Sequence, residues 1–594
     1  MMNKKRLAGL VSLGLAVAVL APATNAFAAT KTTKKPAKAK PAAKPKATAA
    51  PTTIKAAAPA ATAAPAATPA AAAKGGKAVW GLEAESSEGY LPSSSNCAIS
   101  CYQVFGSMAE RLFGVNDKGV TTPWLAESIT PDPTYKVWTI KLKTGIKFHN
   151  GEAFNAEAAK LNIDDFACGS VTLAAWFPLN GFGQLCRSGK LLTGVSTSGD
   201  STLIVTLPIR WVSLPSYLAG GQTYMMAPAQ IKAAERNKPI GTGPFKFKEW
   251  VVGDHLTVTK NPEYWGKNDA KLDEVEFRPV PDENARQAQL ESGQLDFIQT
   301  SNMLAIADFT KLAKDGKIKL SLGSQTFGEV SYDMLNNGVA PFNNKNCRLA
   351  AAYGQDVDTL IKLRSPGSVK ADGPFPKGAL GYLASSGFPN FNLDKAKDFF
   401  GKCKTELGGG DVKFTLGTTT VPDNIQTGAI QKQMMEQVGF KVDTVNLEQQ
   451  KYIGVALVGA YQWFQWRSHG GFDPDQQRVW WHTEMIPRNP ATGAYIYDGK
   501  TISINLARVS DGTIDAAFDQ IRGNSDPAVR KKAAEAINGA MGDNAYDLWR
   551  TRTQWAVAYC SKCGGVTGQK TASGDAKQDF PTGHVEDVAA LTKG

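Results

Sequence analysis

The stretch from Gly241 to Gly266 constrains the fold of this chain more than any other segment. Its apolar residues alternate with polar ones on both sides of a Gly253-Asp254 pair, and they are Phe245, Phe247, Leu256 and Val258. Such alternation is typical of two antiparallel strands with one buried face. The stretch therefore predicts a β-hairpin, which on periodicity alone suits a surface hairpin of any α/β protein.

The N-terminal residues predict an export signal. Three basic residues precede an apolar run from Leu7 to Leu20, and Ala26-Phe27-Ala28 supplies the small residues that signal peptidase requires. The run is shorter than the roughly 18 apolar residues of a membrane helix. We expect residues 1–28 to be a signal peptide and the protein to be exported to the periplasm or the cell surface. No cysteine stands directly after the run as a lipid acceptor, so no lipoprotein is expected.

Residues 29–76 are rich in Ala, Lys, Pro and Thr, and their composition predicts a disordered stalk. Residues 1–77 contain 13 Lys and Arg and no acidic residue, so the net charge of +12 leaves 12 − 13 = −1 for the remainder. A nearly neutral folded part argues against nucleic acid as a partner. The stalk is either a plain spacer or a basic tether to an anionic cell surface.

The remaining 594 − 77 = 517 residues suffice for two or three domains. Eight cysteines in an exported chain predict disulfides, and closeness in sequence suggests the pairs Cys97–Cys101, Cys168–Cys186 and Cys560–Cys563. Cys560-Ser-Lys-Cys563 also matches a redox motif or half of a zinc site, but no second Cys or His pair stands at zinc-finger spacing.

Several further stretches predict regular elements. Lys77–Leu82 suits a strand, followed by a polar loop over residues 85–95 and a helix through Met108, Leu112 and Phe113. Residues 138–157 predict a strand, a short second strand around Ile146 and Phe148, and a helix capped by Asn155. His149 lies in the turn before that helix, where we expect it to satisfy hydrogen bonds.

Three later stretches follow the same logic. Residues 282–298 predict a helix ended by Gly293 and then a strand, and residues 341–356 predict a helix with Arg348 and Asp356 in structural roles. Residues 461–475 combine an aromatic strand, a Gly-Gly loop and an Asp-Pro-Asp turn. That last arrangement suits either an aromatic core or the edge of a ligand cavity.

Five of these stretches, taken in chain order, resemble the family 5 extracytoplasmic solute-binding proteins, the peptide- and nickel-binding receptors of ABC importers. They are residues 138–157, 241–266, 282–298, 341–356 and 461–475. The resemblance implies an α/β fold of the bilobal, periplasmic-binding-protein type II, in its large form with an extra subdomain inserted in the first lobe. We expect the first lobe over residues 77–325, its insertion near 112–213, the second lobe over 326–548, and a return segment over 549–594.

The resemblance also implies which residues contact the ligand. Peptide-binding relatives commonly carry an Asp three residues after the Trp of the fifth stretch, where its carboxylate pairs with the peptide's ammonium group. Here His469 stands at that position after Trp466. We expect ligand contacts from Trp466, His469, Asp473, Trp463 and Tyr90. Asp473 or Asp475 could replace the missing Asp, and a ligand with a carboxylate, a sugar, or a metal chelate held by His469 stays open.

The implied function is capture of a small solute between two lobes and its delivery to an ABC permease and its ATPase subunits. The expected protein is a monomer, peripheral to the membrane or cell wall, with no catalytic residue, no resident metal and no cofactor. Neither Gly-x-Ser-x-Gly nor His-Glu-x-x-His occurs in the sequence. A secreted hydrolase, or a cell-surface sensor or adhesin on the same fold, are the alternatives.

Overall fold

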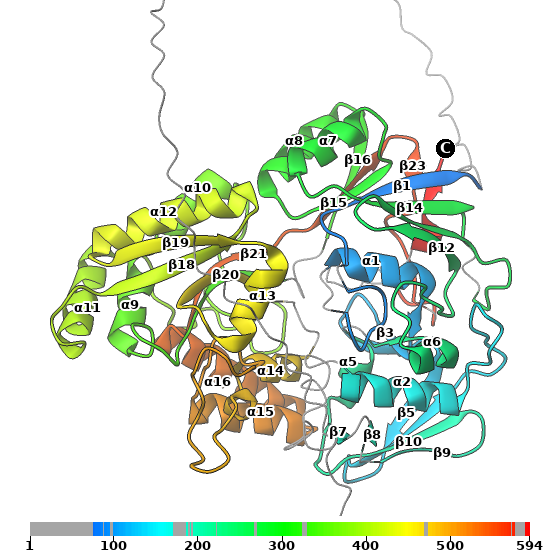
Figure 1. The fold of residues 1–594 in the computed structure, drawn as a ribbon, viewed down its shortest axis with the longest axis horizontal. Coiled ribbons are helices and arrows are strands. Elements are labelled where there is room, and N and C mark those ends of the chain that lie inside the picture. Colours follow the sequence, from blue (N-terminus) through cyan, green and yellow to red (C-terminus); the bar gives the residue numbers. More distant parts are fainter. Residues whose placement is uncertain are drawn as a thin grey trace, which may run out of the picture. The chain divides into compact units, whose positions relative to one another are not determined.

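A computed structural model of the chain describes residues 75–86, 88–95, 99–169, 186–187, 190–191, 194–220, 223–266, 270–323, 329–468, 473–571, 573–576 and 588–594. The compact unit from Ala70 to Gly594 contains all of them. Its elements form two large sheets and a smaller one (Figure 1). We call the part built on the seven-stranded sheet the first lobe and the part built on the five-stranded sheet the second lobe.

The first-lobe sheet mixes parallel and antiparallel strands. In spatial order it contains β12 (Phe245–Val251), β13 (His255–Lys260), β14 (Glu274–Pro279), β1 (Lys77–Leu82), β15 (Phe297–Thr300), β22 (Ala556–Cys560) and β16 (Ile318–Leu322). Strand β1 runs parallel to both β14 and β15. Helix α1 (Ile99–Met108) packs in the core on one face, and α7 (Glu283–Glu291) and α8 (Met303–Lys314) pack in the core on the other.

A four-stranded antiparallel sheet has its own hydrophobic core, which runs in sequence from Leu112 to Ala227. Its strands are β5 (Ala126–Pro131), β6 (Val137–Leu142), β10 (Thr202–Thr206) and β9 (Val195–Thr197). Helices α2 (Ala156–Gly169), α5 (Leu214–Leu218) and α6 (Pro228–Ala233) accompany it. Because β1 precedes this segment and β12 follows it, the segment is an insertion between two strands of the first-lobe sheet.

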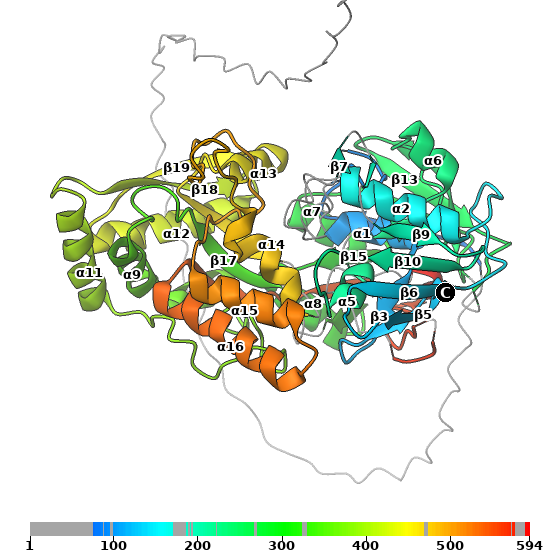
Figure 2. The ribbon, with the colours of Figure 1, turned by 90° about the horizontal axis from the view of Figure 1, so that it is seen from below.

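The second-lobe sheet carries helices on both faces. Its strands are β19 (Lys441–Leu447), β18 (Lys413–Thr419), β20 (Trp463–Ser468), β17 (Val330–Leu335) and β21 (Asp547–Arg552). Helices α9 (Lys345–Gly354), α11 (Leu393–Glu406) and α12 (Pro422–Val438) bury one face. Helices α15 (Gly512–Gly523) and α16 (Pro527–Asn544), side by side in Figure 2, bury the other. Strand β21 extends this sheet to Arg552, four residues past residue 548, where the second lobe was expected to end.

The remaining elements are short or peripheral. They are α10 (Val357–Arg364), α13 (Gln449–Val458), α14 (Arg478–Trp481), three 3-10 turns (Pro474–Gln477, Thr483–Met485, Val588–Ala590) and the strand pairs β2 (Glu110–Arg111) with β11 (Tyr224–Met225), β3 (Phe113–Val115) with β4 (Thr121–Pro123), β7 (Cys186–Arg187) with β8 (Lys190–Leu191), and β23 (Cys563–Gly564) with β24 (Thr592–Lys593).

The hairpin predicted for residues 241–266 is confirmed. Strands β12 and β13 pair antiparallel, and Gly253 turns between them with φ of +81°. Gly241 and Gly243 lie so close to Met108 and Ala109 that a Cβ at either position would come within 3 Å of their backbone. The glycines are therefore required by the close approach of the hairpin's first turn to the end of α1.

Two predicted elements are wrong. The helix expected to run through Leu112 and Phe113 ends at Met108, because Phe105 and Met108 pack in the first-lobe core whereas Leu112 and Phe113 pack in the core of the insertion. A continuous helix cannot reach both cores. The second strand expected around Ile146 and Phe148 is only an isolated bridge, since tight turns bring the chain back on itself there.

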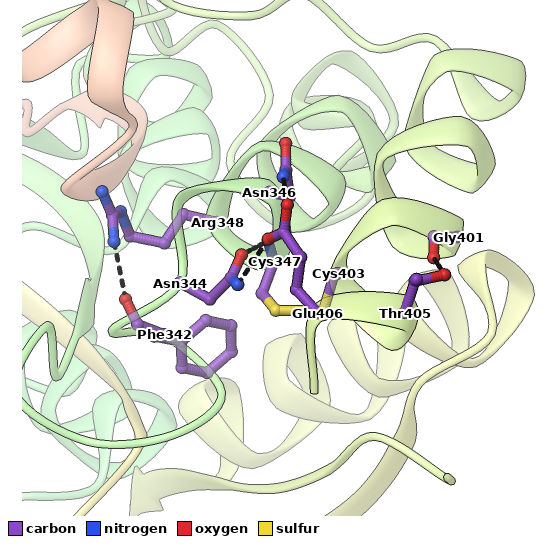
Figure 3. The surroundings of a disulfide bond; sticks show 9 residues. All are labelled: Phe342, Asn344, Asn346, Cys347, Arg348, Gly401, Cys403, Thr405 and Glu406. Atoms are coloured by element: carbon purple, nitrogen blue, oxygen red, sulfur yellow. Dashed lines mark hydrogen bonds between the residues drawn. A yellow bond between two sulfur atoms is a disulfide. The ribbon is translucent and has the colours of Figure 1, made fainter. Parts of the chain in front are cut away.

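Two disulfides have both partners among the described side chains. Cys560–Cys563 is as predicted, and Cys347–Cys403 links α9 to α11 (Figure 3). Cys101 is also disulfide-bonded. The predicted partner of Cys101, Cys97, and the side chains of Cys168 and Cys186 lie outside the described residues.

Candidate functional site

The carboxyl ends of β1 and β15 meet at one edge of the first-lobe sheet. The two strands are parallel neighbours, with Trp80 opposite Phe297. Glu83 follows β1 and Ser301 follows β15, so both residues belong to this edge. Open α/β sheets bind their ligands outside the carboxyl ends of parallel strands, and this edge is therefore the candidate site.

The chain passes between the two large sheets next to this edge. One crossing lies between β16 and β17 and the other between β21 and β22. The two crossings are bonded to each other, since Thr553 N donates to Glu329 O at 2.9 Å and Gly323 N donates to Trp555 O at 3.0 Å. Two crossings whose described end residues are bonded to each other are the kind of connection about which lobes can rotate.

Four residues from both lobes and the crossings form what we call the edge cluster: Ser301, Glu329, Arg467 and Trp555. Arg467 Nη1 donates to Ser301 Oγ at 2.7 Å, and its guanidinium lies 5.0 Å from the centre of the Trp555 ring. Trp555 Nε1 donates to Glu329 Oε2 at 3.1 Å, and Arg467 Nη1 lies 3.9 Å from the same oxygen. The cluster thus joins β20 of the second lobe to β15 of the first.

A second group of charges lies beside it on the first lobe. Glu283 Oε2 accepts from Arg286 Nη2 at 2.6 Å and from Thr300 Oγ1 at 2.8 Å, and Arg286 lies 4.0 Å from Glu83. Burial raises the pKa of Glu283 to about 7, although Arg286 and the Thr300 hydroxyl act against the rise. A carboxyl group with such a pKa next to a ligand edge is a marker of a functional site.

The structure places the five predicted ligand contacts in different surroundings. Trp466 is half-buried and stacks on Tyr452 with ring centres 5.9 Å apart. Trp463 is fully buried in the second-lobe core. Tyr90 is buried in the first-lobe core, edge-on to Phe105 and Trp250. His469 lies outside the described residues.

The acids of the turn after β20 are held in ion pairs. Both oxygens of Asp473 accept from Arg530 Nη2, at 2.7 and 2.5 Å. Burial raises the pKa of Asp473, and Arg530 opposes that rise. Asp475 is fully buried and pairs with Arg522, whose Nη2 lies 3.1 Å from Asp475 Oδ1. Both carboxylates of this turn are therefore paired with arginines inside the protein.

Asp475 also joins the second lobe to the insertion. Its Oδ2 accepts from Trp211 Nε1 at 2.9 Å and from the Ser213 hydroxyl, and its backbone oxygen accepts from Tyr217 OH at 2.5 Å. Val212 N donates to Arg522 O at 2.9 Å in the same place. Asp475 and Arg522 thus form part of a buried contact between the second lobe and the insertion.

His149 has the turn role expected for it. Its Nε2 lies 3.0 Å from Gly243 O, and its backbone N donates to Gly241 O at 2.9 Å. Burial lowers its pKa to about 4, so its ring is neutral at physiological pH. Among the described residues, Asp296, Cys560 and Cys563 have metal-ligand spacing, but the two sulfurs are joined in a disulfide and are not thiolates.

The sequence did not identify the edge cluster. Arg467 directly follows Trp466, and strand alternation places it on the opposite face of β20. Its contacts Ser301 and Trp555 are far away in the chain, so no local pattern connects the three. The one available signal was the cationic side chain at the end of an aromatic strand.

The sequence profile described as "Bacterial extracellular solute-binding proteins, family 5 Middle" matches residues 120–485, more than half of the chain. The glutathione-binding protein GsiB of Pectobacterium atrosepticum is 30% identical over 291 residues, which cover 48% of this chain and 53% of that protein. GsiB of Escherichia coli K12 is 30% identical over 281 residues, covering 46% and 51%. The chain thus spans about half the length of the curated relatives it matches.

Solved structures show the same fold. The periplasmic binding protein DppA of Helicobacter pylori, in complex with the peptide STSA, has a TM-score of 0.71 at 19% identity, covering 88% of this chain and 98% of that one. AgaA of A. tumefaciens R10, in complex with agropinic acid, has a TM-score of 0.70 at 22% identity, covering 87% and 99%. NikA of Staphylococcus aureus, in complex with Ni(L-His)2, has a TM-score of 0.68 at 18% identity, covering 88% and 100%.

Proposed function

Because this chain belongs to family 5 of the bacterial extracellular solute-binding proteins, we propose that it captures a small solute between its two lobes and delivers it to the permease of an ABC importer. The ligands of these relatives and structural neighbours are glutathione, a peptide, agropinic acid and a nickel–histidine complex. All are small and polar, and we propose an oligopeptide or another small polar solute here.

The observation that carries this proposal is the edge cluster. Arg467 of the second lobe contacts Ser301 of the first beside two crossings that are bonded to each other. A solute bound at this edge would touch both lobes close to their pivot and would stabilise the closed arrangement over the open one. A permease that distinguishes the two arrangements then receives only the loaded protein.

The remaining parts of the proposal follow from this mechanism. The partners are a permease with its ATPase subunits, and the protein acts outside the cytoplasm as a monomer without chemical turnover. The first lobe comprises residues 77–325 with its insertion, and the second lobe extends to Arg552, where β21 ends. Among the described residues no helix combines the length and the apolar character needed to cross a bilayer.

We propose Trp466 and His469 as direct solute contacts, because Trp466 is the partly exposed aromatic residue at the end of β20. Trp463, Tyr90 and Asp473 are buried or paired and act as support. The test is native mass spectrometry of the purified full chain after incubation with a tryptic digest of casein. We expect a bound solute that denaturation releases with its mass unchanged.

Two variants locate the site. Trp466→Ala should reduce capture at least about tenfold and leave the melting temperature of the empty protein nearly unaltered. Trp463→Ala removes a fully buried ring that stacks on Phe414 and should cost ~3–5 kcal/mol of stability. A solute that leaves chemically changed would contradict the proposal, and equal stability losses in the two variants would place Trp466 in the core.

A further inference from the structure

The second lobe offers an exposed positive charge near the end of β20, on Arg467. Asp473 and Asp475 are the described acids of the turn that follows, and both are held by arginines, Arg530 and Arg522. Arg467, by contrast, has 40% of its side chain exposed. Among the described residues from Trp463 to Asp475, the exposed charged side chain is therefore that of Arg467.

The described neighbours of Arg467 hold its guanidinium over the Trp555 ring and accept a hydrogen bond from one of its nitrogens. Stacking over Trp555 orients the guanidinium, and Nη1 makes one hydrogen bond, to Ser301 Oγ. Among the described residues, Nε and Nη2 donate no hydrogen bond. A guanidinium presents its N–H groups as a flat fork that matches the two oxygens of a carboxylate.

Glu329 does not occupy this fork. Its Oε2 accepts from Trp555 Nε1, and its distance of 3.9 Å from Arg467 Nη1 is too long for a hydrogen bond. Only 2% of the Glu329 side chain is exposed, so it acts on Arg467 from within the protein. Glu329 thus helps to hold the guanidinium in place, and no described acidic side chain hydrogen-bonds to the exposed edge of Arg467.

We infer that Arg467 binds a carboxylate of the transported solute and thereby selects acidic over neutral solutes. This inference rests on the proposed function and deepens it. The carboxylate would meet Arg467 of the second lobe next to Ser301 of the first, so the same contact that selects the solute also favours closure. Arg467 is then a specificity-determining residue at the end of β20, next to Ser301 of the first lobe.

The test compares free acids with their esters. One half of a tryptic casein digest is converted to methyl esters, and the full chain is offered both halves at equal concentration. The bound components are identified by native mass spectrometry. We expect the wild type to retain free acids at least about tenfold over the matching esters, and Arg467→Gln to lose this discrimination.

Two further variants make the result interpretable. Arg467→Lys keeps the charge without the fork, and it should retain part of the preference for acids. Arg488→Gln is the matched control, because Arg488 is also exposed and lies 3.9 Å from the centre of an aromatic ring, that of Tyr495. It should behave as the wild type does. If Arg467→Gln does not fold, as judged by circular dichroism, the Lys variant decides the matter.

The possible outcomes distinguish the role of Arg467 from the proposed solute-binding function. Equal retention of acids and esters by the wild type, or undiminished discrimination in Arg467→Gln or in a Lys variant used in its place, would overturn the role of Arg467 and leave the binding function intact. Retention of no component by the wild type would overturn both.

Discussion

Glu283 shows how a single residue on the first-lobe edge can make the stability of the protein depend on pH. It begins α7, where the side chain of Asp282 caps the helix by accepting from Ala285 N. Burial is the largest cause of its raised pKa, and the nearby carboxylate of Glu83 adds to it. Arg286, itself buried, holds the Glu283 carboxyl group in place but does not restore its ordinary pKa.

Stability should therefore fall as the pH rises past the ordinary pKa of Glu283. The unfolded chain loses this proton near 4.5, whereas the folded protein keeps it until about 7. The stabilising contribution is complete below 4.5 and is lost as the pH rises through that window, by up to ~3 kcal/mol. Urea unfolding at a series of pH values measures the slope of the unfolding free energy against pH.

The matched pair is Glu283→Gln and Glu291→Gln on the same helix. The first variant should flatten the slope in that window, because Gln does not titrate. The second changes an exposed residue at the other end of α7 and should keep the slope of the wild type. A slope that survives in Glu283→Gln would show that another group causes it.

At the scale of elements, the two disulfides should contribute unequally to stability. Cys347–Cys403 closes 56 residues and ties α9 to α11, where Asn344 Nδ2 and Asn346 Nδ2 also donate to Glu406 at 2.7 and 2.8 Å (Figure 3). Cys560–Cys563 spans three residues at the end of β22. A longer closed loop removes more conformational freedom from the unfolded chain.

Replacing each pair by serines should separate the two effects. Cys347→Ser with Cys403→Ser should cost ~4 kcal/mol of unfolding free energy, and Cys560→Ser with Cys563→Ser ~1.5 kcal/mol. Urea titrations under identical conditions measure the difference, with the second pair as the control for the first. Equal losses, or a larger loss from the shorter loop, would contradict this ranking.

The elements that the sequence predicted well are those with local signals. The alternation around Gly253 identified the β12–β13 hairpin, and Asn155 caps α2 as expected by accepting from Ala158 N at 3.0 Å. Gly293 follows the end of α7 with φ of +79°. Each of these features depends on residues within a few positions of one another, so the sequence contains the whole signal.

The candidate site was harder to predict from the sequence, because its residues are far apart along the chain. Arg467 and Ser301 are 166 positions apart, and Asp475 and Trp211 are 264 apart. Alternation along β20 tells which residues share a face, but not what lies across from that face. For the same reason, Trp463 could be recognised as an aromatic strand residue but not assigned to the core.

At the scale of the whole molecule, the proposed function requires two lobes that close around a solute. Closure is consistent with the bonded crossings near Glu329 and Trp555 and with the buried contact between Asp475 and Trp211. Opening the lobes would have to separate Asp475 from its first-lobe donors. A bound solute that bridges Arg467 and the first-lobe edge would add a further contact that opening has to break, and it would therefore stabilise the closed arrangement.

The most direct test measures the distance between the lobes. Spin labels are attached through a keto amino acid, which leaves the disulfides intact, at exposed Leu304 in α8 and at exposed Val421 before α12. Val421 paired with exposed Leu407 in the same lobe serves as the control. Adding the solute recovered from the wild type should shorten and narrow the Leu304–Val421 distance distribution and leave the control unchanged. A Leu304–Val421 distribution that does not respond to a bound solute would contradict the account.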